Sequence, residues 1–322
     1  MWAWVKSLLR IPHRLETTLY PSMAPTPTSA AAPDSQAARN TTPPGPASVE
    51  AGRWPWPNSL KASVAWHALA AGAAVAVPGA APWALASVVA NHALLTAAGL
   101  WPRSSLLGPN VTRLPEAAAR RGEIALTIDD GPDPEVTPAV LDLLAEHGAT
   151  ASFFFIGERA RQHPALVRRV VAAGHSVQNH SLRHRHHFSL LGPQGLRREI
   201  GAAQALLADL TGQAPHCFRA PAGLRNPLLD AVLHRLGLHL VSWTRRGFDT
   251  RQADPARVKA RLCRGLAAGD ILLLHDGHAQ RAADGRAVLL HVLPLLLQAV
   301  ATAGLQPVHL GAALPHRLPV AA

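Results

Sequence analysis

Short hydrophobic runs alternate with helical patterns from residue 123 to near the end of the chain. The helical pattern over 138–147 is typical, because Val140, Leu141 and Leu144 share one face and Gly148 follows the last turn. Regular alternation of strand and helix predicts a parallel sheet covered by helices. The predicted strands are 123–128, 150–156, 176–179, 216–218, 239–243, 270–274 and 307–310, and the other predicted helices are 164–174 and about 194–210, 227–236, 255–267 and 286–303.

The first hundred residues follow a different pattern. Residues 1–60 become rich in Pro, Ala, Ser and Thr, and we expect them to be disordered because large apolar side chains are too few to offset the entropy of ordering. The segment 61–103 contains two apolar stretches, 62–77 and 83–100, separated by a Pro-Gly break. It predicts an apolar helical hairpin that anchors the chain in a membrane, although each half is slightly shorter than the ~20 residues that span the hydrocarbon core. The alternative is a pair of Ala-rich helices packed on the soluble domain. The segment 104–322 carries the strand-and-helix pattern.

The chain is strongly basic, with a formal net charge of +11 and a pI of about 11.2. Such a charge favours anionic partners, for example envelope polymers or phospholipid headgroups, and a general preference for arginine codons explains it equally well. Aromatic residues make up 5% of the chain and no nucleic-acid-binding motif is present, so we expect no nucleic acid partner. Cys217 and Cys263 lack the spacing of a disulfide framework or a zinc ribbon. The sequence identifies no protein partner.

Candidate metal ligands follow two of the predicted strands. Asp129 and Asp130 come at the end of strand 123–128, in the run Thr-Ile-Asp-Asp-Gly-Pro, and adjacent carboxylates ionise together readily only near a cation. His180 and His184 follow strand 176–179 four residues apart. The two aspartates alone are also typical of a solvated turn. One carboxylate with two imidazoles, however, is a suitable ligand set for Zn²⁺ or another divalent first-row metal.

Two further polar segments follow later strands. Arg-Ala-Pro-Ala-Gly (219–223) comes after strand 216–218, and Leu-Leu-Leu-His-Asp (272–276) ends strand 270–274. With Thr-Ile-Asp-Asp-Gly-Pro (127–132) and His-Ser-Leu-Arg-His (180–184), they resemble, in order, the motifs of the polysaccharide deacetylases of the NodB-homology group, carbohydrate esterase family 4. The resemblance covers about residues 120 to 312. It implies an α/β fold, a distorted (β/α)₇ barrel, with which the seven predicted strands agree.

The resemblance also implies a role for each motif residue. Asp130, His180 and His184 are expected to bind one divalent metal ion, zinc in the first place, with Co²⁺ or Mn²⁺ as alternatives. Asp129 is expected to act as the general base and Arg219 to hold it ionised. His275 is the expected general acid, since an imidazole is suited to proton transfer near neutral pH.

The expected substrate contacts lie in the later motifs. Leu273 lies on the same face of its strand as His275 and is expected to line an acetyl pocket opposite Trp243. Pro221 of the third motif is expected to contact substrate, and Ala222, where family members often have an aromatic residue, suggests a roomier sugar subsite. We expect His186 and His187 to be solvated surface residues.

The sequence departs from the family before the tryptophan. Ser242 stands where many members have an aspartate that tunes the general acid. Either Asp249 turns back to His275, with Gly247 permitting an unusual backbone path, or Asp249 and Arg246 bind substrate.

The resemblance implies a metal-dependent hydrolase that removes N-acetyl groups from an N-acetylglucosamine-containing polysaccharide such as peptidoglycan. The alternatives are a deacylase of a lipid-linked sugar at the membrane and a non-catalytic glycan-binding module. We expect the protein at the bacterial inner membrane with its catalytic domain facing the periplasm. The basic residues that flank the hairpin favour the cytoplasmic side instead, whereas an envelope glycan requires the opposite one.

Overall fold

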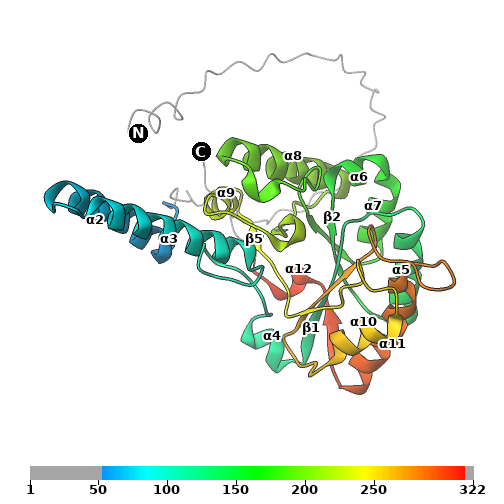
Figure 1. The fold of residues 1–322 in the computed structure, drawn as a ribbon. Coiled ribbons are helices and arrows are strands. Elements are labelled where there is room, and N and C mark those ends of the chain that lie inside the picture. The colour runs from blue at the N-terminus through cyan, green and yellow to red at the C-terminus, as the bar shows by residue number, and fades with distance from the viewer. Residues whose placement is uncertain (1–52, 316–322) are drawn as a thin grey trace, which may run out of the picture. The chain divides into compact units, whose positions relative to one another are not determined.

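The computed structural model describes residues 53–315, so the predicted disorder of 1–60 falls almost entirely outside the described residues. Within them, one parallel sheet forms the centre of the domain that follows the hairpin segment (Figure 1). The strand order is β5-β4-β3-β2-β1-β7-β6, and β8 pairs with the first residues of β1. The strands are β1 (Glu123–Asp129), β2 (Ser152–Phe155), β3 (Ser176–Asn179), β4 (Cys217–Phe218), β5 (His239–Leu240), β6 (Arg245–Arg246), β7 (Ile271–His275) and β8 (Gln306–Val308).

The sheet curls into the predicted distorted barrel, and helices cover its outer face (Figure 1). Each long helix is delimited by its sequence; α8, for example, has Pro193 in its first turn and ends at Gly212, which has φ 69°. The helices of this domain are α4 (Glu116–Arg120), α5 (Val136–Glu146), α6 (Gly157–Gln162), α7 (Pro164–Ala172), α8 (Pro193–Thr211), α9 (Leu229–Arg235), α10 (Pro255–Cys263), α11 (Val288–Thr302) and α12 (Leu310–Ala313), with short 3₁₀ turns η2 (Phe188–Leu190) and η3 (Pro221–Gly223).

Strand β1 is buried on both faces, and its alternate side chains point to two different clusters on the two sides of the sheet. Ile124, Leu126 and Ile128 belong to the hydrophobic core under the outer helices, whereas Ala125 belongs to the cluster on the inner side of the sheet. Because side chains alternate along a strand, Asp129 lies on the same face as Ala125. The same period places the polar end of β1 inside the barrel mouth.

The structure contains one strand that we did not expect. Among the described residues, β6 adds an eighth strand to the seven predicted, and it pairs with β7 through Arg245 and Arg246. The predicted strand 239–243 is correspondingly shorter, because regular pairing of β5 ends at Leu240 and Val241 forms only an isolated bridge with Val111. The chain then passes from β5, at one end of the strand order, to β6 at the other end, where β6 pairs with β7. A hydrophobic run does not reveal such a change of pairing partner.

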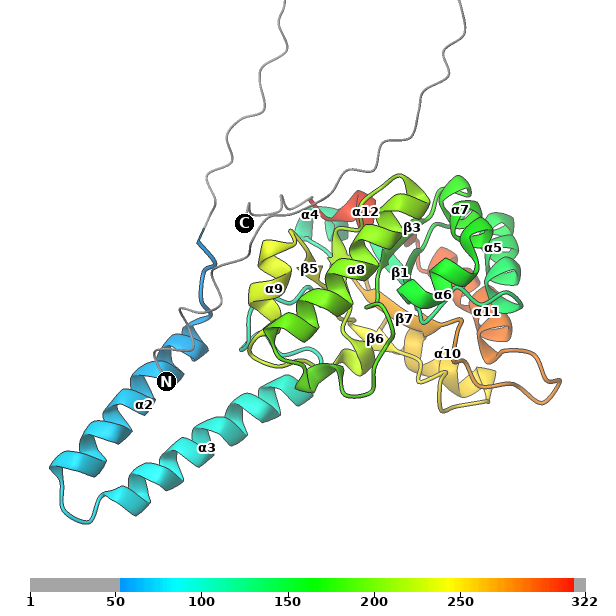
Figure 2. The same ribbon diagram turned by 90° about the horizontal axis from the view of Figure 1, so that it is seen from above.

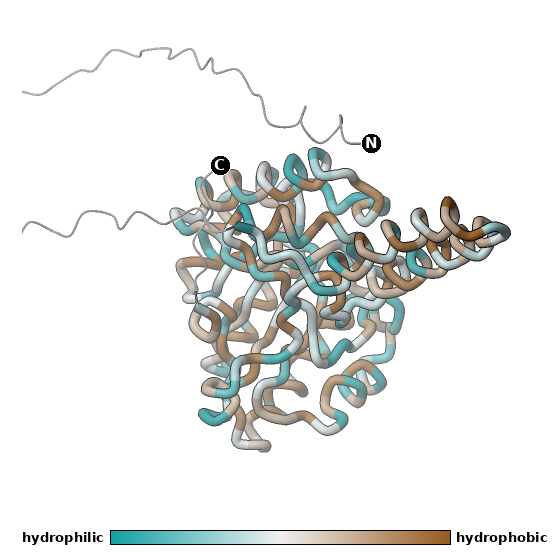
Figure 3. Tube along the Cα trace, turned by 90° about the vertical axis from the view of Figure 1, so that its left-hand side faces the viewer, coloured by the Kyte–Doolittle hydropathy of each residue, from teal (hydrophilic) through white to brown (hydrophobic). Residues whose placement is uncertain are grey.

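The segment before the barrel forms two helices, α2 (Asn58–Ala76) and α3 (Ala81–Leu100), as the apolar hairpin pattern predicts. They run side by side (Figure 2), and hydrophobic residues occur along both (Figure 3). Between the helices, Asn91 donates a hydrogen bond of 2.7 Å to Ser63, and the Nε2 atoms of His67 and His92 lie 3.1 Å apart.

Most of α3 is not buried against the barrel. Leu85, Val89 and Leu94 of α3 are 60 to 67% exposed. Of the described helices, α3 alone is long and apolar enough to cross a membrane by length and composition. Contact with the barrel comes near the end of α3, where the Gly99 carbonyl accepts a hydrogen bond from the backbone N–H of Arg225 at 3.1 Å. Insertion of the hairpin into a membrane stays a prediction.

Candidate active site

The two adjacent aspartates point in different directions because the chain turns between them. Asp129 is the last residue of β1 and pairs with Phe154 of β2 and His275 of β7. Asp130 has φ 77°, a left-handed conformation that aspartate adopts more readily than most residues. Both carboxylates are buried. Each therefore faces a different set of partners.

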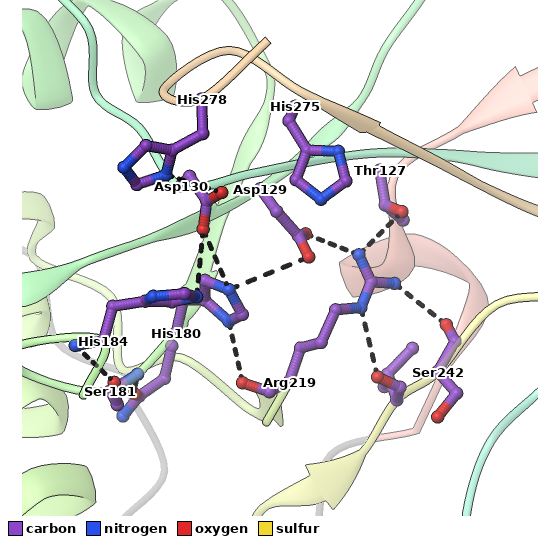
Figure 4. A network of polar contacts seen from close by, with 12 residues as sticks. Thr127, Asp129, Asp130, His180, Ser181, His184, Arg219, Ser242, His275 and His278 are labelled. Carbon is purple, nitrogen blue, oxygen red and sulfur yellow. Dashed lines mark hydrogen bonds and ion pairs between the residues drawn. The ribbon is translucent and has the colours of Figure 1, made fainter. Parts of the chain in front are cut away.

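Asp130, His180 and His184 converge as the sequence predicts (Figure 4). The Oδ1 atom of Asp130 lies 3.2 Å from Nε2 of His180 and 3.3 Å from Nε2 of His184. This oxygen is buried and has no hydrogen-bond partner. The three ligand atoms lie within 4.8 Å of one another, so the trio fits a single divalent cation.

The two histidines reach this point from a loop after β3, not from a helix. His184 has φ 49°, and its backbone N–H donates to Ser181 Oγ at 3.0 Å, which fixes the turn. His180 Nδ1 lies 2.8 Å from the Arg219 carbonyl oxygen, which can only accept. His180 therefore carries a proton on Nδ1 and directs Nε2 toward Asp130, the arrangement usual for a metal-ligating histidine.

The electrostatics of the trio favour a cation. Burial lowers the pKa of His180, but the charges of Asp129 and Asp130 outweigh this effect and raise it. Burial and the neighbouring His180 lower the pKa of His184 to about 4, so this imidazole is neutral at pH 7 and has a free lone pair. A site that draws positive charge onto one buried imidazole also attracts a metal ion.

Asp129 is held by the buried guanidinium of Arg219. The Arg219 Nη1 atom donates to Asp129 Oδ1 at 2.6 Å and to Thr127 Oγ1 at 2.9 Å. Its Nε and Nη2 atoms donate to the carbonyl oxygens of Val241 and Ser242, and the side chain is 1% exposed. Four of the five N–H groups of the guanidinium are thus hydrogen-bonded. This charge-assisted pairing holds the Asp129 carboxylate in a fixed orientation.

His275 is paired with Asp249. The chain turns back so that Asp249 reaches His275, which is the first of the two alternatives that the sequence left open. Asp249 Oδ1 lies 2.9 Å from His275 Nδ1, and Oδ2 accepts the backbone N–H of His275 at 2.7 Å. Burial lowers the pKa of His275, but the charge of Asp249 and its hydrogen bond outweigh this and raise it. The carboxylate is fully buried behind His275. It does not line the pocket, so the alternative in which Asp249 contacts substrate does not match the geometry.

The backbone path to Asp249 differs from our expectation. The left-handed residue is Phe248, with φ 60°, rather than Gly247. Gly247 is needed for space instead, since a Cβ atom there would lie 2.8 Å from Val258 Cγ1. The glycine allows the chain to pass close to α10.

One pocket of about 350 Å³ joins these groups, and Trp243 and Leu273 line it as predicted. Pro221 does not line it; the neighbouring Ala220, Ala222 and Gly223 do, because Pro221 begins the 3₁₀ turn and its side chain is buried. His186 is exposed, as expected, and also forms part of the lining. The complete lining is Asp129, Asp130, His180, His184, His186, Ala220, Ala222, Gly223, Trp243, Arg246, Thr250, Arg251, Leu273, His275 and His278.

Two residues at this site carried no motif signal. His278 Nδ1 lies 2.9 Å from Asp130 Oδ2, and Arg159 Nη2 lies 3.0 Å from His278 Nε2. His278 comes three residues after His275, so its proximity to the fourth motif is the one available signal. Arg159 lies on α6, far from any motif in sequence.

Asp276, which follows His275, supports the turn and faces away from the pocket. Thr137 Oγ1 donates to its Oδ2 at 2.6 Å. Burial raises the pKa of Asp276 to about 7. Gly131 is required opposite it, because a Cβ there would lie 2.3 Å from an Asp276 oxygen.

The chain is similar to known polysaccharide deacetylases in sequence. Residues 116–241 match the family model described as polysaccharide deacetylase. A peptidoglycan-N-acetylglucosamine deacetylase of Bacillus cereus is 34% identical over 54% of this chain and 81% of its own length. A chitooligosaccharide deacetylase of Azorhizobium caulinodans is 35% identical over 49% of this chain and 75% of its own length. A longer peptidoglycan-N-acetylglucosamine deacetylase from Listeria monocytogenes is 34% identical over 55% of this chain, and the match covers 37% of its own length.

The fold is similar to that of solved relatives as well. A family 4 carbohydrate esterase from Streptomyces lividans, solved with acetate, superposes with a TM-score of 0.54 and 32% identity, over 62% of this chain and 98% of the esterase. The agreement in sequence extends over most of several relatives, and the motif residues of the match meet in one pocket. The chain therefore belongs to the polysaccharide deacetylase family.

Proposed function

We propose that this protein is a metal-dependent hydrolase that removes N-acetyl groups from an N-acetylglucosamine-containing glycan. The observation that carries the proposal is that a metal-ligand trio, a clamped carboxylate and a carboxylate-paired imidazole line one pocket. These three elements can together remove an acetyl group from nitrogen, because they supply a Lewis acid, a base for water and an acid for the leaving amine.

Asp130, His180 and His184 would hold the metal ion, zinc by the nitrogen and oxygen character of the donors, with Co²⁺ or Mn²⁺ as alternatives. Bound there, the ion supplies Lewis acidity toward a carbonyl oxygen and lowers the pKa of water. Asp129 takes the proton of the attacking water, since it lines the pocket and Arg219 fixes the orientation of its carboxylate.

His275 provides the proton for the leaving group. Its Nδ1 atom is engaged by Asp249, so Nε2 is the atom that delivers a proton to the departing nitrogen. The raised pKa favours the protonated imidazole that a general acid requires. Leu273 and Trp243 form an apolar wall around the site and would contact the acetyl methyl group.

The substrate class follows from the relatives, which deacetylate peptidoglycan or chitooligosaccharides according to their names. We place the protein at the bacterial inner membrane through its apolar hairpin, with the catalytic domain on the periplasmic side, where such glycans are found. Exposure of apolar side chains along α3 supports a membrane contact.

Acetate release from chitotetraose, measured together with the metal content of the purified protein, tests this function. The proposal predicts one divalent ion per chain and acetate release that stops when the ion is chelated. A protein that binds chitotetraose but releases no acetate with Zn²⁺, Co²⁺ or Mn²⁺ would instead be a glycan-binding module.

A further inference from the structure

An apolar groove adjoins the catalytic pocket. It has a volume of about 570 Å³, and the end of α3 and the residues after it form one side, from Ala97 to Arg103. Trp243, Arg246 and Phe248 form the other side. Trp243 and Arg246 also line the catalytic pocket, so the two hollows share a wall.

The lining of the groove is suited to an apolar ligand. Leu100, Trp101 and Phe248 are 58, 64 and 43% exposed, although each is a large hydrophobic residue. Apart from two arginines, the lining offers no hydroxyl, amide or carboxylate side chain. Sugar hydroxyl groups placed there would lose their hydrogen bonds to water without replacement. The groove is therefore a poor sugar subsite and a good site for a hydrocarbon chain.

Arg246 places a positive charge at the shared wall. Its guanidinium carbon lies 5.3 Å from the Trp243 ring centroid and 5.0 Å from that of Phe248. The Arg246 Nε atom is buried without a hydrogen-bond partner. In the described part of the chain, no carboxylate oxygen lies within 4.0 Å of the Arg246 guanidinium nitrogens, so Arg246 forms no ion pair there. An arginine held in this way is suited to bind a phosphate.

We propose that the groove binds the lipid chain of a glycolipid in which a phosphate joins the chain to the N-acetylated sugar. The sugar enters the catalytic pocket, the phosphate contacts Arg246, and the chain runs along Leu100 and Trp101 toward α3. This order matches the order of the surfaces: a catalytic pocket, a cation, an apolar groove and then the helix that is apolar enough to span a membrane. The inference rests on the proposed deacetylase function and narrows its substrate to a lipid-linked sugar.

Binding of farnesyl phosphate and of farnesol to the full-length protein in detergent micelles, by calorimetry, tests the groove without catalysis. Leu100→Glu should weaken binding of both compounds at least tenfold, because it places a charge against the chain. Arg246→Gln should weaken binding of farnesyl phosphate and leave farnesol binding unchanged. Leu190→Glu is the control, since Leu190 is 82% exposed and lies outside the groove. Equal binding by the Leu100 and Leu190 variants would overturn the proposal.

A comparison of turnover with two substrates distinguishes the lipid-linked substrate from the proposed deacetylase function on which it rests. We expect kcat/KM for farnesyl-diphosphate-linked N-acetylglucosamine to exceed that for chitotetraose at least tenfold, and Leu100→Glu to reduce this ratio at least tenfold. If chitotetraose is the better substrate and the ratio of the two kcat/KM values is the same in wild type and Leu100→Glu, the deacetylase function is supported and the lipid-linked substrate is contradicted. If neither compound releases acetate from metal-loaded protein, the deacetylase function fails, and the binding measurement still decides the groove.

A second inference concerns the orientation of Asp130. Arg159 donates from Nη1 to the carbonyl oxygens of Asp130 and Gly277, at 2.9 and 3.1 Å, and from Nη2 to His278 Nε2 at 3.0 Å. Because arginine can only donate, His278 Nε2 accepts and the imidazole carries its proton on Nδ1. That proton is then donated to Asp130 Oδ2 over 2.9 Å. The other oxygen, Oδ1, is left without a partner opposite His180 and His184.

We infer that His278 is a positioning residue that fixes which oxygen of Asp130 faces the metal. The backbone is shaped for this arrangement, since a Cβ atom on Gly277 would lie 2.2 Å from Arg159 Nη1. Hydrogen bonds of this kind to a ligating residue typically change metal affinity by about 10–100-fold. His278→Ala should weaken Zn²⁺ binding by that factor in competition with a chelator.

Two further variants make the test specific. His278→Asn retains a donor near the position of Nδ1 and should restore most of the affinity, whereas His187→Ala, a histidine outside the pocket lining, should leave it unchanged. If His278→Ala and His187→Ala bind Zn²⁺ equally well, His278 does not position Asp130.

Discussion

The carboxylate of Asp249 engages His275 twice, through Nδ1 at 2.9 Å and through the backbone N–H at 2.7 Å. Many family members place an aspartate directly before the tryptophan, where this chain has Ser242. Here the charge reaches the imidazole from a residue seven positions further along the chain. Ser242 serves the structure instead, since its Oγ donates to the Pro102 carbonyl at 2.5 Å and its own carbonyl accepts from Arg219.

Replacement of Asp249 by Asn should move the alkaline limb of the pH–rate profile to lower pH. Burial lowers the pKa of His275 and the negative charge of Asp249 more than offsets it. A general acid is active below its pKa, so removal of the charge ends activity at a lower pH. The profile of Asp142→Asn, which removes an exposed carboxylate on α5, is the control and should match wild type. An alkaline limb that stays in place in Asp249→Asn would show that this pair does not set the proton transfer.

The two neighbouring aspartates should respond differently to the same change. Asp129→Asn removes the base and should lower kcat by at least ~10² while Zn²⁺ affinity stays the same. Asp130→Asn removes a metal ligand and should weaken Zn²⁺ binding itself. Chelator competition and steady-state kinetics on both variants make the comparison. Equal loss of metal by the two variants would contradict this division of roles.

Arg219→Met should destabilise the fold as well as the site. The substitution leaves Asp129 buried without its cation and leaves carbonyl oxygens of Val241 and Ser242 without donors. Loss of one partner of a buried ion pair costs about 3–5 kcal/mol of the free energy of unfolding. Arg120→Met, which removes an exposed ion pair with Glu116, should cost about 0–1 kcal/mol. Urea denaturation measures both, and equal effects would contradict the structural role of Arg219.

The catalytic domain should fold from residue 97 onward but lose stability if it starts at residue 105. The segment between contributes the carbonyl oxygens of Gly99 and Pro102, which accept from Arg225 and from Asn110 and Ser242. Each such hydrogen bond contributes about 1 kcal/mol. Urea midpoints of chains 97–322 and 105–322 make the comparison; identical midpoints would show that this segment contributes nothing.

The barrel and the pocket differ in how much of them the sequence predicts. The strands β1 and β7 are buried, largely hydrophobic runs that end in motif residues, and their period-two alternation is enough to place Asp129, Leu273 and His275 inside the barrel. The residues that meet at the metal site follow from the chemistry of their side chains. Both depend on short-range patterns.

The supporting contacts depend on long-range geometry, and the sequence does not reveal them. β6 pairs with β7 through two arginines that show no strand pattern. Arg159 comes from α6 and reaches His278, which is 119 positions away in the chain. The turn toward Asp249 uses a left-handed Phe248, a conformation that no sequence rule assigns to phenylalanine.

Reconstitution of metal-free protein with Zn²⁺ tests the central claim most directly. Full-length protein is stripped with a chelator, and acetate release from chitotetraose, with farnesyl-diphosphate-linked N-acetylglucosamine in parallel, is followed as Zn²⁺ is added. The account predicts that activity rises to a plateau at one equivalent of Zn²⁺ per chain, and that His184→Ala needs far more Zn²⁺ to reach it. Acetate release that persists in the stripped protein, or a His184→Ala curve that matches wild type, would contradict it.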